Sequence, residues 1–366
     1  MPASLIRSPA RSSRKKRLVG VLCLGGALLA IGLGVAGLAQ AGDPEVAVTP
    51  VPLSGLCGDK SAVLPRDVAG RLAVSAWYAK PADGAGPPAR SPVIFFNAGW
   101  GGRVEGHMNQ IDALVQRGYV VIGIDQKSSE AYREFVDFSD EAAFTRTRAA
   151  VDLKAGEFAK DNSAVLDILQ AAVSCAGDHN VASVLKRLDF ERVGIVGYSF
   201  GGAVAAETSR QDSRFKAAVN LDGWLFGDVG RLGLKRPFLE ISDDSGLPTT
   251  ADLNSSDTVH RLTSRLTDGD YKQVLANMDR YGGYFLVMVG SRHQSFVDVS
   301  QRSFLARMAS LLPSGRRTIE AVNIYAGAFL DRYVAGASSD LSKLIASPDD
   351  GVRVVFAKSP LQEATQ

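Results

Sequence analysis

The chain has 366 residues, 46% of them hydrophobic, and a formal net charge of +2 at pH 7. This length and composition exclude a disordered or fibrous protein and fit a large globular domain with a substantial core. Six of the 41 basic residues and none of the 39 acidic residues precede residue 42. The rest of the chain is therefore slightly acidic, which argues against a nucleic-acid partner.

The first 41 residues have the order of a targeting segment. Basic residues end at Arg17, an uncharged run covers residues 18–38, and Ala39-Gln40-Ala41 follows. This order is typical of a signal peptide that is cleaved after Ala41. The uncharged run is also long enough to cross a bilayer, so the alternative is an N-terminal membrane anchor. We expect an exported protein, secreted or periplasmic, in which residues 42–366 form a single domain.

Two cysteines, Cys57 and Cys175, remain after the leader. In an exported protein this favours a disulfide between them, and the alternative is two buried thiols. Neither lies near a cluster of histidines or further cysteines. We therefore expect no metal site and no cofactor.

Short apolar runs alternate with helical patterns along the rest of the chain. The apolar runs predict strands at residues 72–79, 93–96, 120–124, 193–196, 216–221, 238–241 and 284–289. Helical patterns are clearest near residues 108–115, 141–174, 255–280 and 319–333. Residues 352–356 either pair at a sheet edge or are disordered. Apolar strands that alternate with helices predict an α/β fold, with a mostly parallel sheet covered by helices on both faces.

The strand at residues 193–196 leads into a glycine-rich turn around Ser199. The turn reads Gly197-Tyr198-Ser199-Phe200-Gly201, and a helix rich in small residues follows. A strand, a G-x-S-x-G turn and a helix together form the nucleophile elbow of the α/β-hydrolase fold. The alternative is a glycine-rich turn with an idle serine, but the flanking elements are the context that the motif requires. We predict that Ser199 is a catalytic nucleophile.

A serine nucleophile needs a histidine base. In this fold the order along the chain is serine, acid, histidine, so His107 and His179 come too early. His260 lies in a polar helical stretch, whereas His293 follows the last predicted strand. His293 is therefore the predicted base.

The acid that orients the base has three candidates. Asp222 ends the strand after the nucleophile helix, and Asp243 and Asp244 end the next strand. Either position occurs in α/β-hydrolases, so position alone leaves the choice open.

The oxyanion hole requires two backbone N–H groups that point at the developing charge. One is expected from Phe200, which follows the nucleophile, and the other from residues 97–102, with Trp100 preferred and Gly101 next. Trp100 and Trp224 both flank the predicted site. We therefore expect Trp224 to line an apolar pocket for the acyl group.

Three segments, residues 197–202, 221–224 and 290–296, together carry a family resemblance. They resemble the plasma-type platelet-activating factor acetylhydrolases, their bacterial relatives and the similar dienelactone-hydrolase-like esterases. The resemblance spans about residues 91–334 and implies an α/β-hydrolase fold without a metal. It also implies Asp222 as the acid, because the family's acid follows the strand after the nucleophile helix. Tyr198 departs from the histidine that the family usually has before the serine.

These observations predict an exported serine carboxylester hydrolase with Ser199, Asp222 and His293 as its triad. The expected partner is an ester or lipid substrate, such as a short-to-medium acyl ester or a phospholipid with a short or oxidised acyl chain. One alternative is a polyester or cutinase-like hydrolase with the same site residues, and an acyltransferase also stays open. An alternative of another class is a catalytically silent binding protein with this fold. The presence of the serine, the histidine and the elbow glycines argues against that last alternative.

Overall fold

A computed structural model describes residues 44–54, 56, 66–80, 89–126, 136–298 and 313–360 of the chain. Within these residues the strands form one nine-stranded sheet in the order β1-β2-β4-β3-β5-β6-β7-β8-β9. The strands are β1 (Val46–Pro50), β2 (Leu72–Ala79), β3 (Ser91–Asn97), β4 (Val120–Gln126), β5 (Leu188–Tyr198), β6 (Phe215–Leu221), β7 (Phe238–Ser242), β8 (Gly283–Met288) and β9 (Val352–Lys358). The strands from β4 to β8 pair in parallel, whereas β1, β2 and β9 pair antiparallel at the two edges.

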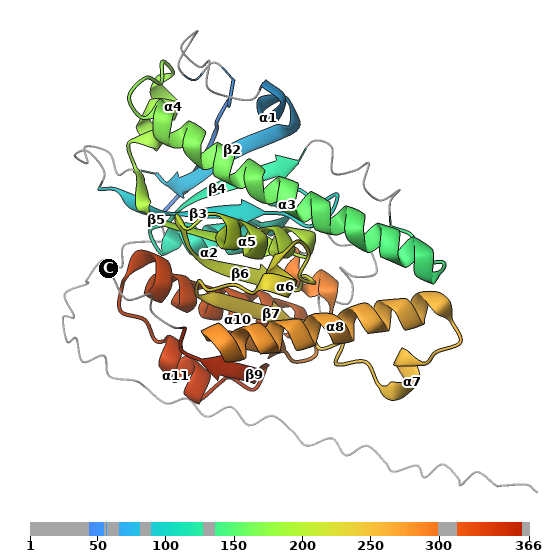
Figure 1. Cartoon of the computed structure of the whole chain (residues 1–366). Coiled ribbons are helices and arrows are strands. Elements are labelled where there is room, and N and C mark those ends of the chain that lie inside the picture. Colours follow the sequence, from blue (N-terminus) through green and yellow to red (C-terminus); the bar gives the residue numbers. More distant parts are fainter. Residues whose placement is uncertain are drawn as a thin grey trace, which may run out of the picture. The chain divides into compact units, whose positions relative to one another are not determined.

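Helices cover both faces of this sheet, and the long helices α3 and α8 run across the front of it in Figure 1. The helices are α1 (Arg66–Arg71), α2 (Met108–Gln116), α3 (Glu141–Ala172), α4 (His179–Leu185), α5 (Phe200–Gln211), α6 (Val229–Leu232), α7 (Thr250–Leu253), α8 (Thr258–Tyr281), α10 (Pro313–Leu330) and α11 (Leu341–Ala346). Short helical turns add η2 (Val104–His107), η4 (His293–Phe296) and η6 (Asp331–Ala335). This architecture confirms the predicted α/β-hydrolase class.

The alternation of side chains along each strand creates two cores. On β3, Val93 and Phe95 face α3, α4, α5 and α8, whereas Ile94 and Phe96 face α2, α10 and α11. Successive side chains of a strand point to opposite faces, so a strand that is apolar at every position supplies both cores. That is why the central strands read as unbroken apolar runs in the sequence.

Side-chain caps explain where the two longest helices begin. Asp140 accepts a hydrogen bond from Ala143 N at 2.7 Å before α3, and Asp257 accepts one from His260 N at 2.9 Å before α8. Such caps satisfy backbone N–H groups that have no partner within the helix. Helix α8 ends at Tyr281 and is followed by Gly282, whose φ of 84° suits glycine.

Most of the predicted elements match the structure in place and type. Residues 352–356, for which the sequence left two options, form edge strand β9, paired with β8. Strand β1 was not predicted, because its five residues, Val46–Pro50, are too few to set a clear period and end in proline.

Several sequence predictions fall outside the described residues. The leader of residues 1–41, including the alternative anchor at residues 18–38, lies there, and so does Cys57. Cys175 is disulfide-bonded. Among the helices of the described residues, none is both long and apolar enough to span a membrane.

A buried polar cluster ties helices α3 and α5 to strand β3. Asn162 on α3 donates to Asn97 Oδ1 and to Thr208 Oγ1, each at 2.9 Å, and accepts from Asn97 Nδ2 at 3.2 Å. All three side chains are buried. In a region without water, the loss of one member leaves its partners without hydrogen bonds.

We expect Asn162→Ala to lower the free energy of unfolding by about 2–4 kcal/mol, because it leaves the buried amide of Asn97 unsatisfied. Urea denaturation of the full chain measures this loss. The matched control is Asn180→Ala at an exposed position of helix α4, for which we expect a change of about 0.5 kcal/mol or less. Equal stability of the two variants would contradict this role of the cluster.

Candidate active site

Ser199 occupies the turn between β5 and α5. Its φ of 55° lies in the positive region that side chains rarely adopt. Its N–H donates to Leu221 O on β6 at 2.8 Å. The turn is tight enough that a Cβ at Gly197 would lie 1.9 Å from Gly201 O, and a Cβ at Gly201 would lie 2.3 Å from Asn97 O. Glycine is therefore a steric requirement at both flanking positions of the motif.

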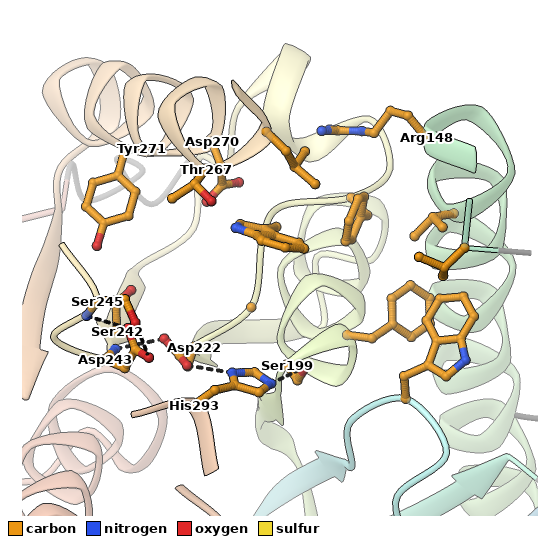
Figure 2. A pocket seen from close by; sticks show the side chains of 18 of the residues that line it. Arg148, Ser199, Asp222, Ser242, Asp243, Ser245, Thr267, Asp270, Tyr271 and His293 are labelled. Carbon is orange, nitrogen blue, oxygen red and sulfur yellow. Dashed lines mark hydrogen bonds and ion pairs between the residues drawn. The ribbon is translucent and has the colours of Figure 1, made fainter. Parts of the chain in front are cut away.

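A series of hydrogen bonds begins at the Ser199 hydroxyl (Figure 2). Ser199 Oγ lies 3.1 Å from His293 Nε2, and His293 Nδ1 lies 2.6 Å from Asp222 Oδ2. The other carboxylate oxygen of Asp222 accepts from Asp243 N at 2.7 Å. In this order the imidazole can take the serine proton while the carboxylate holds the ring. The structure thus brings together the three residues that the sequence singles out, and their catalytic roles stay a prediction.

The two other carboxyl groups considered for the acid engage different partners. Asp243 accepts from both the N–H and the hydroxyl of Ser245, at 2.8 and 2.7 Å. Asp244 accepts from Gly290 N at 3.0 Å and pairs with Arg353 at 2.9 Å. Of the three candidates, Asp222 is the one in contact with the imidazole.

Tyr198, the residue before the nucleophile, holds the loop of His293. Its ring stacks on the imidazole with the centroids 4.9 Å apart, and its hydroxyl donates to His293 O at 3.0 Å. His107, which comes before Ser199 in the chain, packs on the same tyrosine at 5.0 Å. Burial lowers the pKa of His107 to about 4, so this ring is neutral at physiological pH.

The loop of His293 is also tied to the first turn of α2. Asp298 accepts from Met108 N and from Asn109 Nδ2, each at 2.7 Å. Gln110 Nε2 donates to Phe296 O at 2.8 Å. A carboxylate at this position satisfies N–H groups that a helix leaves free and interacts favourably with the helix dipole. These contacts fix the loop that carries the base.

Asp222, like Ser199, has a positive φ, here 59°. The side chain of buried Asn220 supports this bend, because its Oδ1 accepts from Gly223 N at 3.0 Å and its Nδ2 donates to Gly223 O at 2.6 Å. Asn220 Nδ2 also donates to Glu240 Oε2 on β7 at 2.8 Å. The backbone around the candidate acid is therefore held by a side chain from the end of its own strand.

Glu240 on β7 also supports the backbone around Asp222, because it holds the side chain of Asn220. It is 2% exposed and accepts from Ser242 Oγ at 3.2 Å. Burial raises the pKa of its carboxyl well above the ordinary value, and the nearby Asp270 and Asp222 raise it further. Sequence reasoning missed both Asn220 and Glu240. The signal that could have found them is one polar residue inside each of two apolar strands, where burial demands a hydrogen-bonded partner.

Two backbone segments flank the Ser199 side chain. Helix α5 begins at Phe200, so the N–H of this residue belongs to the helix end that lacks internal partners. The turn that carries Trp100 packs on the elbow, because a Cβ at Gly99 would lie 3.1 Å from Ser199 Cβ. The rings of Trp100 and Phe200 are 4.8 Å apart. The residues predicted to form the oxyanion hole therefore lie close to the nucleophile, and their role as donors stays a prediction.

A cavity of about 530 Å³ opens beside Ser199, Asp222 and His293. Its walls are mainly apolar and largely aromatic, and they include Trp100, Phe138, Phe144, Val151, Phe200, Trp224, Phe226 and Leu266. Trp224 is part of this cavity wall, and its role in binding an acyl group stays a prediction. Over the described part of the chain, no group of three His, Cys, Asp or Glu side chains is arranged to hold a metal ion.

Asp270 is a buried carboxyl in the wall of this cavity, and burial raises its pKa to about 7. A folded-state pKa above the unfolded value of about 4 means that the folded protein binds more protons between these two pH values. Stability is then lost as the pH rises through this range. We therefore compare the free energy of unfolding of Asp270→Asn with that of the unsubstituted protein. We expect this difference to rise by about 2–3 kcal/mol in favour of the variant between pH 5 and pH 7.5. Urea denaturation at each pH measures it.

The matched control for this measurement is Asp228→Asn. A hydrogen bond from Arg231 lowers the pKa of Asp228, so this carboxylate and its arginine partner both stay ionised throughout the same pH range. We expect the difference in free energy of unfolding between this control variant and the unsubstituted protein to stay constant over this pH range. A flat difference for Asp270→Asn as well would contradict the raised pKa of Asp270.

Known proteins are similar to this chain in sequence and in fold. The model of the family described as platelet-activating factor acetylhydrolase, isoform II, matches residues 107–311, which is more than half of the chain. The platelet-activating factor acetylhydrolase of Bos taurus is 30% identical over 69 residues, or 18% of this chain and 16% of that protein. A probable 1-alkyl-2-acetylglycerophosphocholine esterase of Arthroderma benhamiae is 26% identical over 143 residues, or 39% of this chain and 34% of that protein. The matches thus span about a third or less of these relatives.

A solved structure shows the likeness in fold over a longer stretch. The ferulic acid esterase of Streptomyces cinnamoneus is 22% identical with a TM-score of 0.55, and the match covers 88% of this chain and 99% of that one. At this identity the likeness concerns the fold alone. The extent of the family match, over residues that include the elbow, Asp222 and His293, is what assigns the chain. The chain belongs to the family of platelet-activating factor acetylhydrolase, isoform II.

Proposed function

We propose that the chain is a serine carboxylester hydrolase that works through an acyl-enzyme on Ser199. The observation that carries this proposal is the series of hydrogen bonds from Ser199 through His293 to Asp222, at the wall of an apolar cavity. Membership of the family supports an ester as the substrate, since the matched relatives are named as an acetylhydrolase and an esterase.

The first half of the reaction transfers the acyl group to the enzyme. His293 Nε2 takes the Ser199 proton as Oγ attacks the ester carbonyl carbon, and Asp222 stabilises the imidazolium that forms. The backbone N–H groups of Phe200 and Trp100 stabilise the negative charge on the carbonyl oxygen. The ester C–O bond then breaks, and His293 returns the proton to the departing alcohol.

The second half releases the acyl group by the same chemistry. His293 takes a proton from water, the water oxygen attacks the acyl carbon, and Ser199 leaves with the proton from His293. The free acid and the original enzyme result. An alcohol in place of water would give acyl transfer, so the hydrolytic outcome depends on which nucleophile reaches the acyl-enzyme.

The cavity supports an apolar acyl group of short to medium length, including the short or oxidised acyl chains of phospholipids. Its volume of about 530 Å³ is typical of sites for small molecules, and Trp224 and Trp100 contribute to its aromatic wall. A substrate series from acetyl to long-chain and polymeric esters reports the acyl length directly. A preference for polymeric esters would favour the polyester-hydrolase alternative.

We also propose that the protein is exported as a single domain of residues 42–366. The support is the order of basic stretch, uncharged run and Ala39-Gln40-Ala41 in the sequence. We expect mass spectrometry of the exported protein to find Gly42 as the first residue. Recovery of the intact leader in membrane fractions would instead favour the anchor at residues 18–38.

The decisive test of the reaction is Ser199→Ala. We expect it to reduce ester hydrolysis by about 10⁴-fold or more and to abolish labelling by a fluorophosphonate probe, because the variant has no nucleophile. His293→Ala should cause a loss of similar size, since the two residues act as a unit. Rates and labelling are measured on samples whose thermal unfolding matches that of the unsubstituted protein.

Two exposed residues of the same types provide the controls. Ser174 lies just after α3, and His260 pairs with Asp252 at 2.9 Å on the surface. Ser174→Ala and His260→Ala should retain full activity and labelling. Undiminished ester cleavage by folded Ser199→Ala would reject the proposal.

A further inference from the structure

The cavity has a polar end that the proposed reaction does not use. In Figure 2, Ser199 and His293 lie at one side of the cavity, and Arg148, Thr267 and Asp270 lie at the opposite side. Aromatic residues of the cavity wall, among them Phe226 and Trp224, complete the lining. An acyl group attached to Ser199 would therefore cross an apolar stretch before it met polar groups.

Asp270 is built into this polar end. It lies on α8, is 6% exposed, and accepts a hydrogen bond from Leu225 N at 2.6 Å through Oδ1. Its second oxygen, Oδ2, has no hydrogen-bond partner among the described residues, although the side chain lines the cavity. A carboxylate oxygen that lines a cavity and has no protein partner is available to bind a ligand there, so this atom points to a ligand.

Arg148 supplies the neighbouring positive charge and is itself held in position. Its Nε donates to Asp152 at 3.1 Å, its Nη2 donates to Leu225 O at 3.0 Å, and its guanidinium lies 4.9 Å from the centre of the Phe226 ring. The third nitrogen, Nη1, makes no hydrogen bond within the described part of the chain. Leu225 thus links the two groups, because its N–H binds Asp270 and its carbonyl binds Arg148.

We propose that this end of the cavity is a subsite for an uncharged hydroxyl group at the far end of the acyl group, and that Asp270 selects substrates that carry it. This inference rests on the proposed ester hydrolysis and names a substrate class for it. Hydroxyaryl and hydroxyalkyl acyl groups share the required chemistry.

The charges at the subsite favour a neutral group. A cationic end group would meet the like charge of Arg148, and an anionic one would meet the like charge of Asp270 in its ionised form. A hydroxyl both donates and accepts. It therefore fits Asp270 in either protonation state, which is relevant because burial raises the pKa of this carboxyl to about 7.

The test compares matched pairs of methyl esters. The aryl pair is phenylpropanoate and its para-hydroxy derivative, and the alkyl pair is hexanoate and its omega-hydroxy derivative. We expect the unsubstituted protein to favour the hydroxylated member of at least one pair by about 10- to 100-fold in kcat/KM. The pair that responds identifies whether the acyl group is aryl or alkyl.

Variants of Asp270 then test its part in this preference. Asp270→Leu should bring the ratio within the responding pair close to one, because the change removes the carboxyl group that binds the hydroxyl. A general loss of activity from the lost bond to Leu225 N affects both members of a pair alike and cancels in this ratio. Asp270→Asn keeps a donor and an acceptor and should retain the preference. The matched control is Asp268→Leu, whose carboxylate pairs with Lys272 at 2.6 Å on the same helix outside the cavity.

Each failure has a distinct meaning. Hydrolysis of the unhydroxylated esters without preference in either pair would overturn the subsite and leave the proposed reaction standing. An unchanged preference in folded Asp270→Leu would also overturn it, and so would a stronger preference for acyl groups that end in a carboxylate. If Asp270→Leu does not fold, the ratios of the unsubstituted protein still decide the question. No hydrolysis of any ester would reject the reaction itself.

Discussion

The packing of two bent segments at the ends of neighbouring strands is the constraint on which the candidate site depends. Ser199 follows β5 and Asp222 follows β6, and both have a positive φ. Each such residue costs about 1–3 kcal/mol, so the surrounding contacts must hold it. The bond from Ser199 N to Leu221 O ties the first bend to the second strand, and the Asn220 side chain holds Gly223 after the second bend. These contacts therefore keep the nucleophile close to the loop that carries the acid.

The parallel sheet explains why the residues of the candidate site lie close together. Trp100 follows β3, Ser199 follows β5, Asp222 follows β6 and His293 follows β8. Because β3 to β8 run parallel, their carboxyl ends meet at one edge, where ligand sites of open α/β sheets form. The base comes from the most distant of these strands, which accounts for the separate anchoring of its loop by Tyr198 and Asp298.

The cavity is made from the same side chains that pack the helices over one face of the sheet. Phe200 on α5, Val151 on α3 and Leu266 on α8 belong to one apolar cluster and also line the cavity. The shape of the cavity is therefore coupled to the positions of these helices. Two buried carboxyl groups with raised pKa values, Glu240 and Asp270, lie close to this region. Their burial costs stability near neutral pH, which is a cost that functional sites commonly carry.

Features that depend on neighbours along the chain can be predicted from the sequence. Apolar runs predicted the central strands, and the glycines around Ser199 predicted the elbow, because a steric limit within five residues leaves a readable pattern. The order of elements along the chain led to His293, since the fold sets the sequence of serine, acid and base.

Contacts between residues that are distant in the chain are visible only in the folded protein. Position left Asp222, Asp243 and Asp244 open, and the structure has the first of these in contact with His293. The support from Asn220 and Glu240, and the meeting of Asp270 with Arg148 around Leu225, join segments far apart in the chain. Local propensity carries no information about such pairs, because burial and partners exist only once the strands and helices have packed.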